Sequence, residues 1–358
     1  MKQGRGAPPQ TGGDMTKPRI NLALQGGGAH GAFTWGVLDR ILEGGEVEIA
    51  GISGTSAGAL NGAALKAGLL SGGAEAAREN LAWLWGRIGA LGSLDGTPWV
   101  NALLPSTPFL GRAIEYSPGY AIGDWLARAT SPYGLGPFYV NPLRPILEDL
   151  RFDEVCSAAG PDLSVCATNV RTGKIRVFRR GEIGVDALLA SACLPTLFRA
   201  VEIAEPDGTV ESYWDGGYSG NPALFPLYEP HLPDDVVIVN INPLERAELP
   251  YTAQEILNRV NEISFNSALL SELRAIAFVQ RMIAEGSIPE GRMKRVLVHM
   301  IADDDTMTDL SVATKTVPQP LILARLKAAG RAAAESFLDA HIDKLGQASS
   351  VNLAEMYG

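Results

Sequence analysis

The chain has 358 residues, 46% of them hydrophobic, and its formal net charge at pH 7 is −10. This length allows a large core, which we expect to form one α/β domain with extensions. An acidic chain without a dense Lys/Arg cluster is repelled by phosphate groups, which argues against a nucleic-acid partner and against electrostatic capture by an anionic membrane. Any peripheral membrane or lipid-surface contact is therefore expected to be apolar.

The N-terminal segment and the cysteines both favour a cytoplasmic protein. Residues 1–17 are rich in Gly, Pro and Gln without an apolar run, so we expect a disordered tail and not a secretory signal. No stretch approaches the ~20 apolar residues of a membrane-spanning helix. Cys156, Cys166 and Cys193 are odd in number and show no CxxC spacing, so we interpret them as core residues in a reducing compartment.

The first ordered part of the chain contains two strand–turn–helix units. Residues 20–24 predict a buried strand, and a glycine turn joins it to a helix whose apolar face spans 33–42. Residues 46–52 predict a second strand, and a second glycine turn leads into an Ala-rich helix at 57–69. Two such units in succession imply a parallel sheet with crossover helices.

Residues 91–140 have a different composition, in which prolines alternate with bulky apolar side chains. So long an irregular insertion is typical of a lid or a binding loop. We expect an apolar rim over the active site, although the same side chains could instead pack a long loop onto the core. The candidate rim residues are Trp99, Leu103, Leu104, Phe109 and Leu110.

The remainder of the chain predicts further strands and helices. Strands are expected at 163–168, 175–179, 210–214, 236–241 and 296–301, and helices at 184–192, 252–285 and 320–345. The breaks between the last elements are short, so we expect no second independent domain. The predicted organisation is a catalytic core at 18–245 and a mainly helical C-terminal extension at 246–358 that packs on it.

The first motif with chemical content is Gly54-Thr55-Ser56-Ala57-Gly58, a GxSxG. Its glycines permit a sharp strand-to-helix turn that exposes the hydroxyl of Ser56 at a helix N-terminus. The motif alone is weak. Its place between a predicted strand and a predicted helix favours a nucleophilic serine over a plain glycine turn.

A glycine-rich loop, Gly26-Gly27-Gly28-Ala29-His30-Gly31, follows the first strand. Taken alone, this loop fits the GxGxxG fingerprint of dinucleotide-binding proteins. That fingerprint also requires an acidic residue at the end of the next strand. Residues 49–53 contain no carboxylate, which argues against a nucleotide-binding oxidoreductase. Unobstructed amides at a helix N-terminus suit an oxyanion hole better.

The base that would activate the serine is less evident. His231, His299 and His341 lie in contexts that we interpret as a surface loop, a core strand and a helix. Tyr213-Trp214-Asp215-Gly216-Gly217 ends a predicted strand with an aspartate on a glycine turn, which can present a carboxylate to a cleft. A simple Asp-Gly hairpin turn is the alternative at this position.

In this order, the glycine loop, the GxSxG motif and Asp215-Gly216-Gly217 resemble the three signatures of the patatin-like phospholipases. The segments 190–198 and 167–173 are also similar to that family. The resemblance covers roughly residues 18–225, and beyond about residue 245 only a general likeness to bacterial members with a helical extension remains.

The resemblance implies a three-layer α/β/α patatin-like fold with a mostly parallel sheet and a Ser56–Asp215 dyad without histidine. It places Gly26, Gly27 and Gly28 around the oxyanion, with Gly31, Gly54, Gly58, Gly216 and Gly217 as supporting motif residues. The family usually has Arg or Lys at the position of His30, which puts a fixed positive charge beside the oxyanion in doubt. Many members have Ala at the position of Gly217, a mild change.

Together these features predict a serine lipid acyl hydrolase of the phospholipase A or lipase type, which works by two-step acyl transfer and needs no cofactor and no metal. Another apolar ester, such as an intracellular storage polyester, would suit the same chemistry. A non-catalytic membrane-surface module with this fold is the rival from a different class, and the presence of both Ser56 and Asp215 argues against it. The sequence leaves the oligomeric state open.

Overall fold

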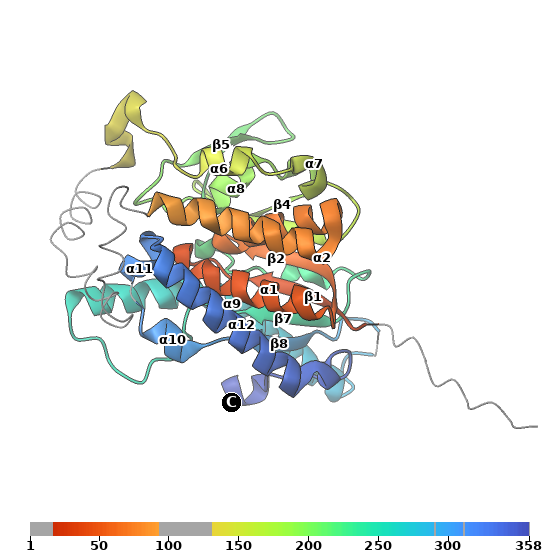
Figure 1. Ribbon diagram of the computed structural model, residues 1–358. Coiled ribbons are helices and arrows are strands. Elements are labelled where there is room, and N and C mark those ends of the chain that lie inside the picture. Colours follow the sequence, from red (N-terminus) through yellow and green to blue (C-terminus); the bar gives the residue numbers. More distant parts are fainter. Residues whose placement is uncertain (1–16, 93–130, 290, 311, 358) are drawn as a thin grey trace, which may run out of the picture.

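The computed structural model describes residues 17–92, 131–289, 291–310 and 312–357 (Figure 1). Most of the tail predicted at 1–17 and of the insertion predicted at 91–140 lies outside these residues. So do all five candidate rim residues: Trp99, Leu103, Leu104, Phe109 and Leu110. The rim therefore stays a prediction.

The described part of the chain is built on one eight-stranded sheet with the order β5-β6-β3-β2-β1-β7-β8, and β4 pairs with β3 off this path. The strands are β1 Arg19–Leu24, β2 Glu48–Thr55, β3 Asp162–Asn169, β4 Ile175–Arg179, β5 Val201–Ala204, β6 Val210–Asp215, β7 Asp235–Val239 and β8 Leu297–Ile301. Strands β3, β2, β1, β7 and β8 run parallel, whereas β4, β5 and β6 form antiparallel pairs.

Helices cover both faces of this sheet (Figure 1). They are α1 Ala32–Gly44, α2 Ala57–Leu91, α6 Arg144–Glu148, α7 Phe152–Val155, α8 Val185–Ser191, α9 Ala253–Ala284, α10 Asp304–Thr308, α11 Val312–Thr316, α12 Pro320–His341 and α13 Leu353–Tyr357. On β1, Leu22 and Leu24 join a core with α1, α2 and α12, whereas Ala23 joins a second core with α9 and α13. The predicted three-layer α/β/α fold is confirmed.

The helix after the GxSxG turn is longer than predicted. The prediction ended it at residue 69, but α2 continues to Leu91 beyond a break at Gly72 and Gly73, whose backbone is not helical. The second part buries Leu81 and Trp85 in the core. The glycine pair interrupts the apolar periodicity on which the prediction relied, although tertiary packing stabilises the helix beyond it.

Some strands also differ from the prediction. β2 extends to Thr55, so it ends directly before the candidate nucleophile, whereas β7 ends at Val239 and not at Ile241. The residues after β7 leave the sheet and contact the glycine loop. The edge strand β5, with the sequence Val-Glu-Ile-Ala, was not predicted because four partly exposed residues make no apolar run.

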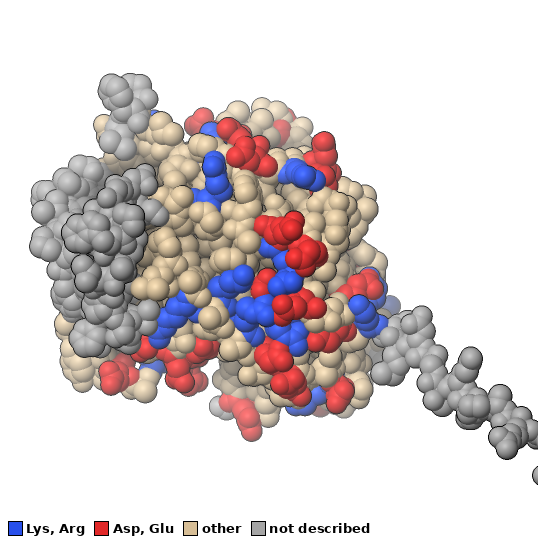
Figure 2. Space-filling model, in the orientation of Figure 1, with Lys and Arg blue, Asp and Glu red and all other residues tan. Residues whose placement is uncertain are grey.

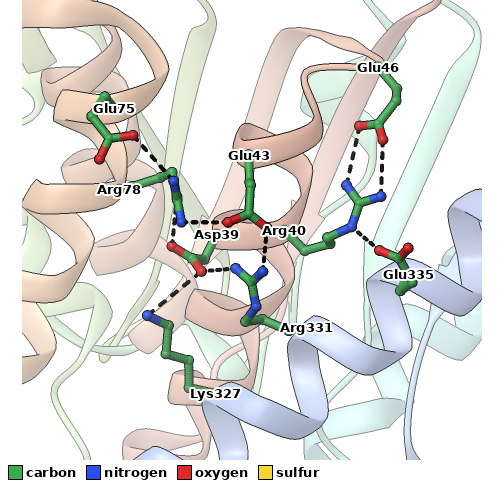
Figure 3. A network of polar contacts seen from close by, with 9 residues as sticks. All are labelled: Asp39, Arg40, Glu43, Glu46, Glu75, Arg78, Lys327, Arg331 and Glu335. Carbon is green, nitrogen blue, oxygen red and sulfur yellow. Dashed lines mark hydrogen bonds and ion pairs between the residues drawn. The ribbon is translucent and has the colours of Figure 1, made fainter.

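A network of charged side chains ties α12 to α1 and α2 (Figure 3). Asp39 of α1 lies at its centre and is 4% exposed. Its carboxylate contacts Arg78 of α2 and both Lys327 and Arg331 of α12. In Figure 2 positive and negative side chains alternate in a band across this face. The network stabilises the packing of the last long helix against the first.

None of the helices in the described ranges combines the length and the apolar composition of a membrane-spanning segment. All three cysteines are described and are free thiols, and Cys166 and Cys193 are buried.

Candidate active site

Two turns of the chain meet at the carboxyl end of β3. Thr55, the last residue of β2, pairs with Cys166, and Asp215, the last residue of β6, pairs with Ala167. Since β4 occupies the other edge of β3 along these residues, β6 pairs with the edge that β2 has left. Both strands therefore end against consecutive residues of β3, which brings the serine turn next to Asp215.

Ser56 occupies the turn between β2 and α2 in a backbone conformation that residues with a side chain rarely adopt, with φ 54° and ψ −124°. Such strain persists only where the surrounding structure imposes it. The Ser56 N–H donates to Oγ of Ser191 at 2.9 Å, and that hydroxyl donates to the Cys166 carbonyl at 2.6 Å. Ser191 of α8 thus ties the strained turn to β3.

Asp215 is fully buried. Its Oδ1 accepts the Gly217 N–H at 2.8 Å, whereas Oδ2 has no hydrogen-bond partner within the described part of the chain. Burial raises the pKa of Asp215 to about 7, although the Gly217 N–H and the nearby Ser56 hydroxyl lower it. This hydroxyl lies near the carboxyl without meeting hydrogen-bond geometry, and a carboxyl with this pKa can exchange protons at neutral pH.

The glycine loop lies against Ser56. A Cβ on Gly26 would lie 2.6 Å from the Cβ of Ser56, so only glycine fits there. The Gly26 N–H is engaged, because it donates to Oδ1 of Asn221 at 2.6 Å. Among the residues that the structure describes, the N–H groups of Gly27 and Gly28 donate no hydrogen bond. These two amides are the ones free to bind an oxyanion.

The other glycines of the three motifs are packed as tightly. An added Cβ would lie within 2.7 Å of a neighbouring atom at Gly31, Gly54, Gly58, Gly216 and Gly217. Gly58 approaches the backbone of β1, and Gly216 approaches the backbone of β3. Their small size lets the two turns and the loop converge.

A buried network of amide side chains holds the glycine loop. Asn221 and Asn242 both donate from Nδ2 to the Gly26 carbonyl, at 3.3 and 2.9 Å. The side-chain oxygen of Gln25 accepts backbone N–H groups that follow β7, and its Nε2 donates to Asn266 of α9. The sequence analysis missed these residues, since amides whose partners lie about 200 positions away form no local pattern.

Two of the histidines lie at the opposite end of the sheet. His231 contacts Asp162, the first residue of β3, at 2.7 Å, and His299 contacts Asp235, the first residue of β7, at 2.9 Å. His341 ends α12 and packs its ring against a phenylalanine. Within the described residues, none of the three contacts the serine turn or its neighbouring carboxyl.

His30 is the histidine of the glycine loop. It is buried, and its Nε2 lies 2.7 Å from Oγ1 of Thr314 on α11. Burial and then the charge of Lys315 lower the pKa of His30 well below its usual range. The ring is therefore neutral at physiological pH and supplies no fixed positive charge to the loop.

Neither a metal cluster nor a reactive thiol adjoins the site in the part of the chain that the structure describes. No group of three or more His, Cys, Asp or Glu side chains there is placed to hold a metal ion. Cys193, whose carbonyl accepts the Asp215 N–H, donates from Sγ to the Arg199 carbonyl at 3.0 Å. Burial raises the pKa of Cys193 to about 12, so it stays a protonated structural thiol.

The sequence model of the family described as patatin-like phospholipase matches residues 22–228. This span contains the glycine loop, the serine turn and Asp215, and it ends before Asn242 and α9. No curated protein matches the chain.

The solved structures that resemble the chain include the following three. VipD from Legionella pneumophila shares 16% identity at a TM-score of 0.43, over 94% of this chain and 72% of VipD. The type III effector ExoU shares 18% identity at 0.37, over 91% of this chain and 54% of ExoU. ExoU in its complex with SpcU from Pseudomonas aeruginosa shares 17% at 0.26, over 91% of this chain and 61% of that one. At such identities the likeness concerns the fold alone.

Proposed function

Because the chain belongs to the patatin-like phospholipase family, we propose that it hydrolyses lipid-type esters with Ser56 as nucleophile and Asp215 as general base. The observation that supports this most is the meeting of a strained serine turn with a buried carboxyl whose pKa is about 7. One oxygen of that carboxyl is held by a backbone N–H, and the other is left to receive a proton.

Acylation begins when the Asp215 carboxylate takes the Ser56 proton. Oγ attacks the ester carbonyl carbon, and the carbonyl π electrons move to its oxygen. The N–H groups of Gly27 and Gly28 stabilise this oxyanion, and the N-terminus of α2 adds partial positive charge. When the tetrahedral intermediate collapses, the ester C–O bond breaks and the alcohol leaves with the proton that Asp215 returns.

Deacylation repeats the sequence with water as nucleophile. Asp215 takes a proton from water, hydroxide attacks the acyl-serine, and collapse releases the fatty acid and restores Ser56 with the returned proton. No histidine takes part in this scheme.

The substrate is an ester with an apolar acyl group, a phospholipid or an acylglycerol, and the chain works in the cytoplasm at a peripheral lipid surface. The family supports a lipid ester. A storage polyester would undergo the same chemistry and is the second candidate substrate.

The test is labelling with a fluorophosphonate probe, followed by turnover of an ester panel of graded chain length. We expect the label on Ser56, loss of label in Ser56→Ala, and a fall in turnover of at least about 10³-fold, since only binding and the oxyanion hole remain. Phospholipid vesicles and a polyester film in the same panel separate the two substrate classes. Undiminished turnover in Ser56→Ala would overturn the proposal.

A further inference from the structure

The segment that follows the matched family span reaches back to the glycine loop through α11. At Gly28, whose φ is +59°, an added Cβ would collide with the main-chain carbonyl of Lys315. The neighbouring Thr314 hydroxyl contacts His30 at the other end of the same short turn. The backbone of α11 thus packs directly against the glycine loop, which carries the free N–H groups of Gly27 and Gly28.

The Lys315 side chain contacts the loop by a second route. Its Nζ donates to Oδ1 of Asn242 at 2.9 Å. Nδ2 of the same asparagine donates to the Gly26 carbonyl and to Gln25, at 2.9 and 3.1 Å. The ammonium therefore orients the amide that fixes Gly26, which lies against the nucleophile.

Charge is concentrated at this point. Lys315 is partly buried, and burial lowers the pKa of its ammonium to about 8. Glu262 of α9 raises this pKa and Arg246 lowers it. Glu262 is itself paired with Arg246 and Arg259, and the facing His30 is neutral.

We propose that Lys315 is a positioning residue of the glycine loop: its ammonium orients Asn242 and places positive charge beside that amide, and its carbonyl supports Gly28. This inference rests on the proposed function. It means that a residue outside the matched family span completes the site, and that the last third of the chain is required for catalysis.

The test compares Lys315→Met with Lys315→Arg and with Lys344→Met, a matched control on an exposed lysine of the same C-terminal segment. The readouts are the rate of fluorophosphonate labelling at Ser56, kcat and KM on a short soluble ester, and the melting temperature. We expect Lys315→Met to lose about tenfold to a hundredfold in kcat and labelling rate with little change in KM. This loss of rate is smaller than the ~10²–10³-fold loss that follows removal of an oxyanion donor itself.

Lys315→Arg should recover most of the rate, and Lys344→Met should match the wild type. The wild-type rate should also fall as pH rises through about 8, where Lys315 loses its charge, whereas Lys315→Arg should keep its rate. A purely structural lysine would not produce this difference between the pH profiles.

A double variant tests whether Lys315 acts through Asn242, and its melting temperature controls for a folding defect. If Lys315 acts through Asn242, Lys315→Met combined with Asn242→Ala should lose clearly less than the product of the two single losses. Wild-type labelling rates in Lys315→Met, or independent losses in the double variant, would overturn the inference and leave the proposed function standing. A wild-type protein that is not labelled at Ser56 would overturn both.

Discussion

The N–H of Gly26 donates to Oδ1 of Asn221 at 2.6 Å, and Nδ2 of the same side chain returns a hydrogen bond to the Gly26 carbonyl at 3.3 Å. One amide side chain thus satisfies both backbone groups of Gly26, which lies against Ser56. The pairing removes the Gly26 N–H from the candidate oxyanion donors and helps to hold the next two amides in place.

Replacing Asn221 with Ala should therefore lower kcat about tenfold or more, although the side chain touches no reacting atom. Without the two hydrogen bonds to Asn221, Gly26 can rotate its N–H toward the proposed oxyanion position. This rotation would tilt the N–H groups of Gly27 and Gly28 away from it. Steady-state kinetics on a short soluble ester measure the effect. A change confined to KM would show that Asn221 serves binding and not the loop.

Gly27 and Gly28 should respond differently to Ala. A Cβ on Gly27 meets the end of the flexible Ile241 side chain at 2.8 Å, so Gly27→Ala should lose rate with a small change in melting temperature. Gly28 has φ +59° and faces the rigid carbonyl of α11, so Gly28→Ala should also lose stability. Thermal melts beside kinetics separate the two, and equal melting temperatures would contradict this geometry.

The pH dependence of the reaction should report Asp215. Its carboxylate form is the proposed base and its pKa is about 7, so kcat/KM should rise as pH increases through about 7. Asp215→Asn cannot accept a proton and should abolish turnover, whereas single replacements of His231 or His299 should not. A folded histidine variant as inactive as Asp215→Asn would show that the dyad is incomplete.

Ser191→Ala should weaken both stability and rate. The variant leaves the buried N–H of Ser56 and the Cys166 carbonyl without their shared hydroxyl, at a cost of about 1–3 kcal/mol for an unsatisfied group. The strained turn then loses one of its restraints. Urea unfolding checks the stability, with the exposed Ser267→Ala on α9 as control, and an unchanged midpoint would disprove the role.

Asp39→Asn should destabilise the protein by about 1–3 kcal/mol at pH 7, less than a fully buried pair because Arg78 and Arg331 are partly exposed. Burial raises the pKa of Asp39, but Arg78, Lys327 and Arg331 together lower it by more. The pKa of Asp39 is therefore below its usual value. The stabilising contribution of Asp39 is fully present at pH values above its pKa in the unfolded chain, which is about 4. It is lost as pH falls through the lower pKa of the folded protein.

Denaturation of both proteins from pH 7 to pH 3 tests this prediction. The difference between wild type and Asp39→Asn should shrink toward the acidic end. Glu335→Gln is the control, because its exposed pair with Arg40 should contribute less than about 1 kcal/mol. A difference that stays constant with pH would assign the effect to packing.

The fold, and the candidate site residues of the three motifs, could be predicted from local patterns. Strand–glycine–helix units, the GxSxG turn and an aspartate at a strand end are all written within a few neighbouring residues. Asn242, Asn266 and Lys315 could not be found this way, because their roles arise from contacts across 73 to 241 positions of the chain. Ser191 lies in the segment 190–198 that resembles the family, but its hydrogen bonds with Ser56 and Cys166 could not be predicted from that segment. The edge strand β5 and the far part of α2 were missed for lack of a periodic apolar signal.

The charged contact between α12 and α1 also bears on the order in which the protein matures. Asp39 leaves the ribosome long before Lys327 and Arg331, its partners on α12. Until α12 has been synthesised, Arg78 of α2 is the only one of the three cations that can pair with this carboxylate, through Oδ1, and Oδ2 must stay hydrated, which opposes burial of this face of α1. We expect the growing chain to remain open over this face and to consolidate only after α12 has emerged, so that the proposed hydrolytic activity begins after translation of this helix.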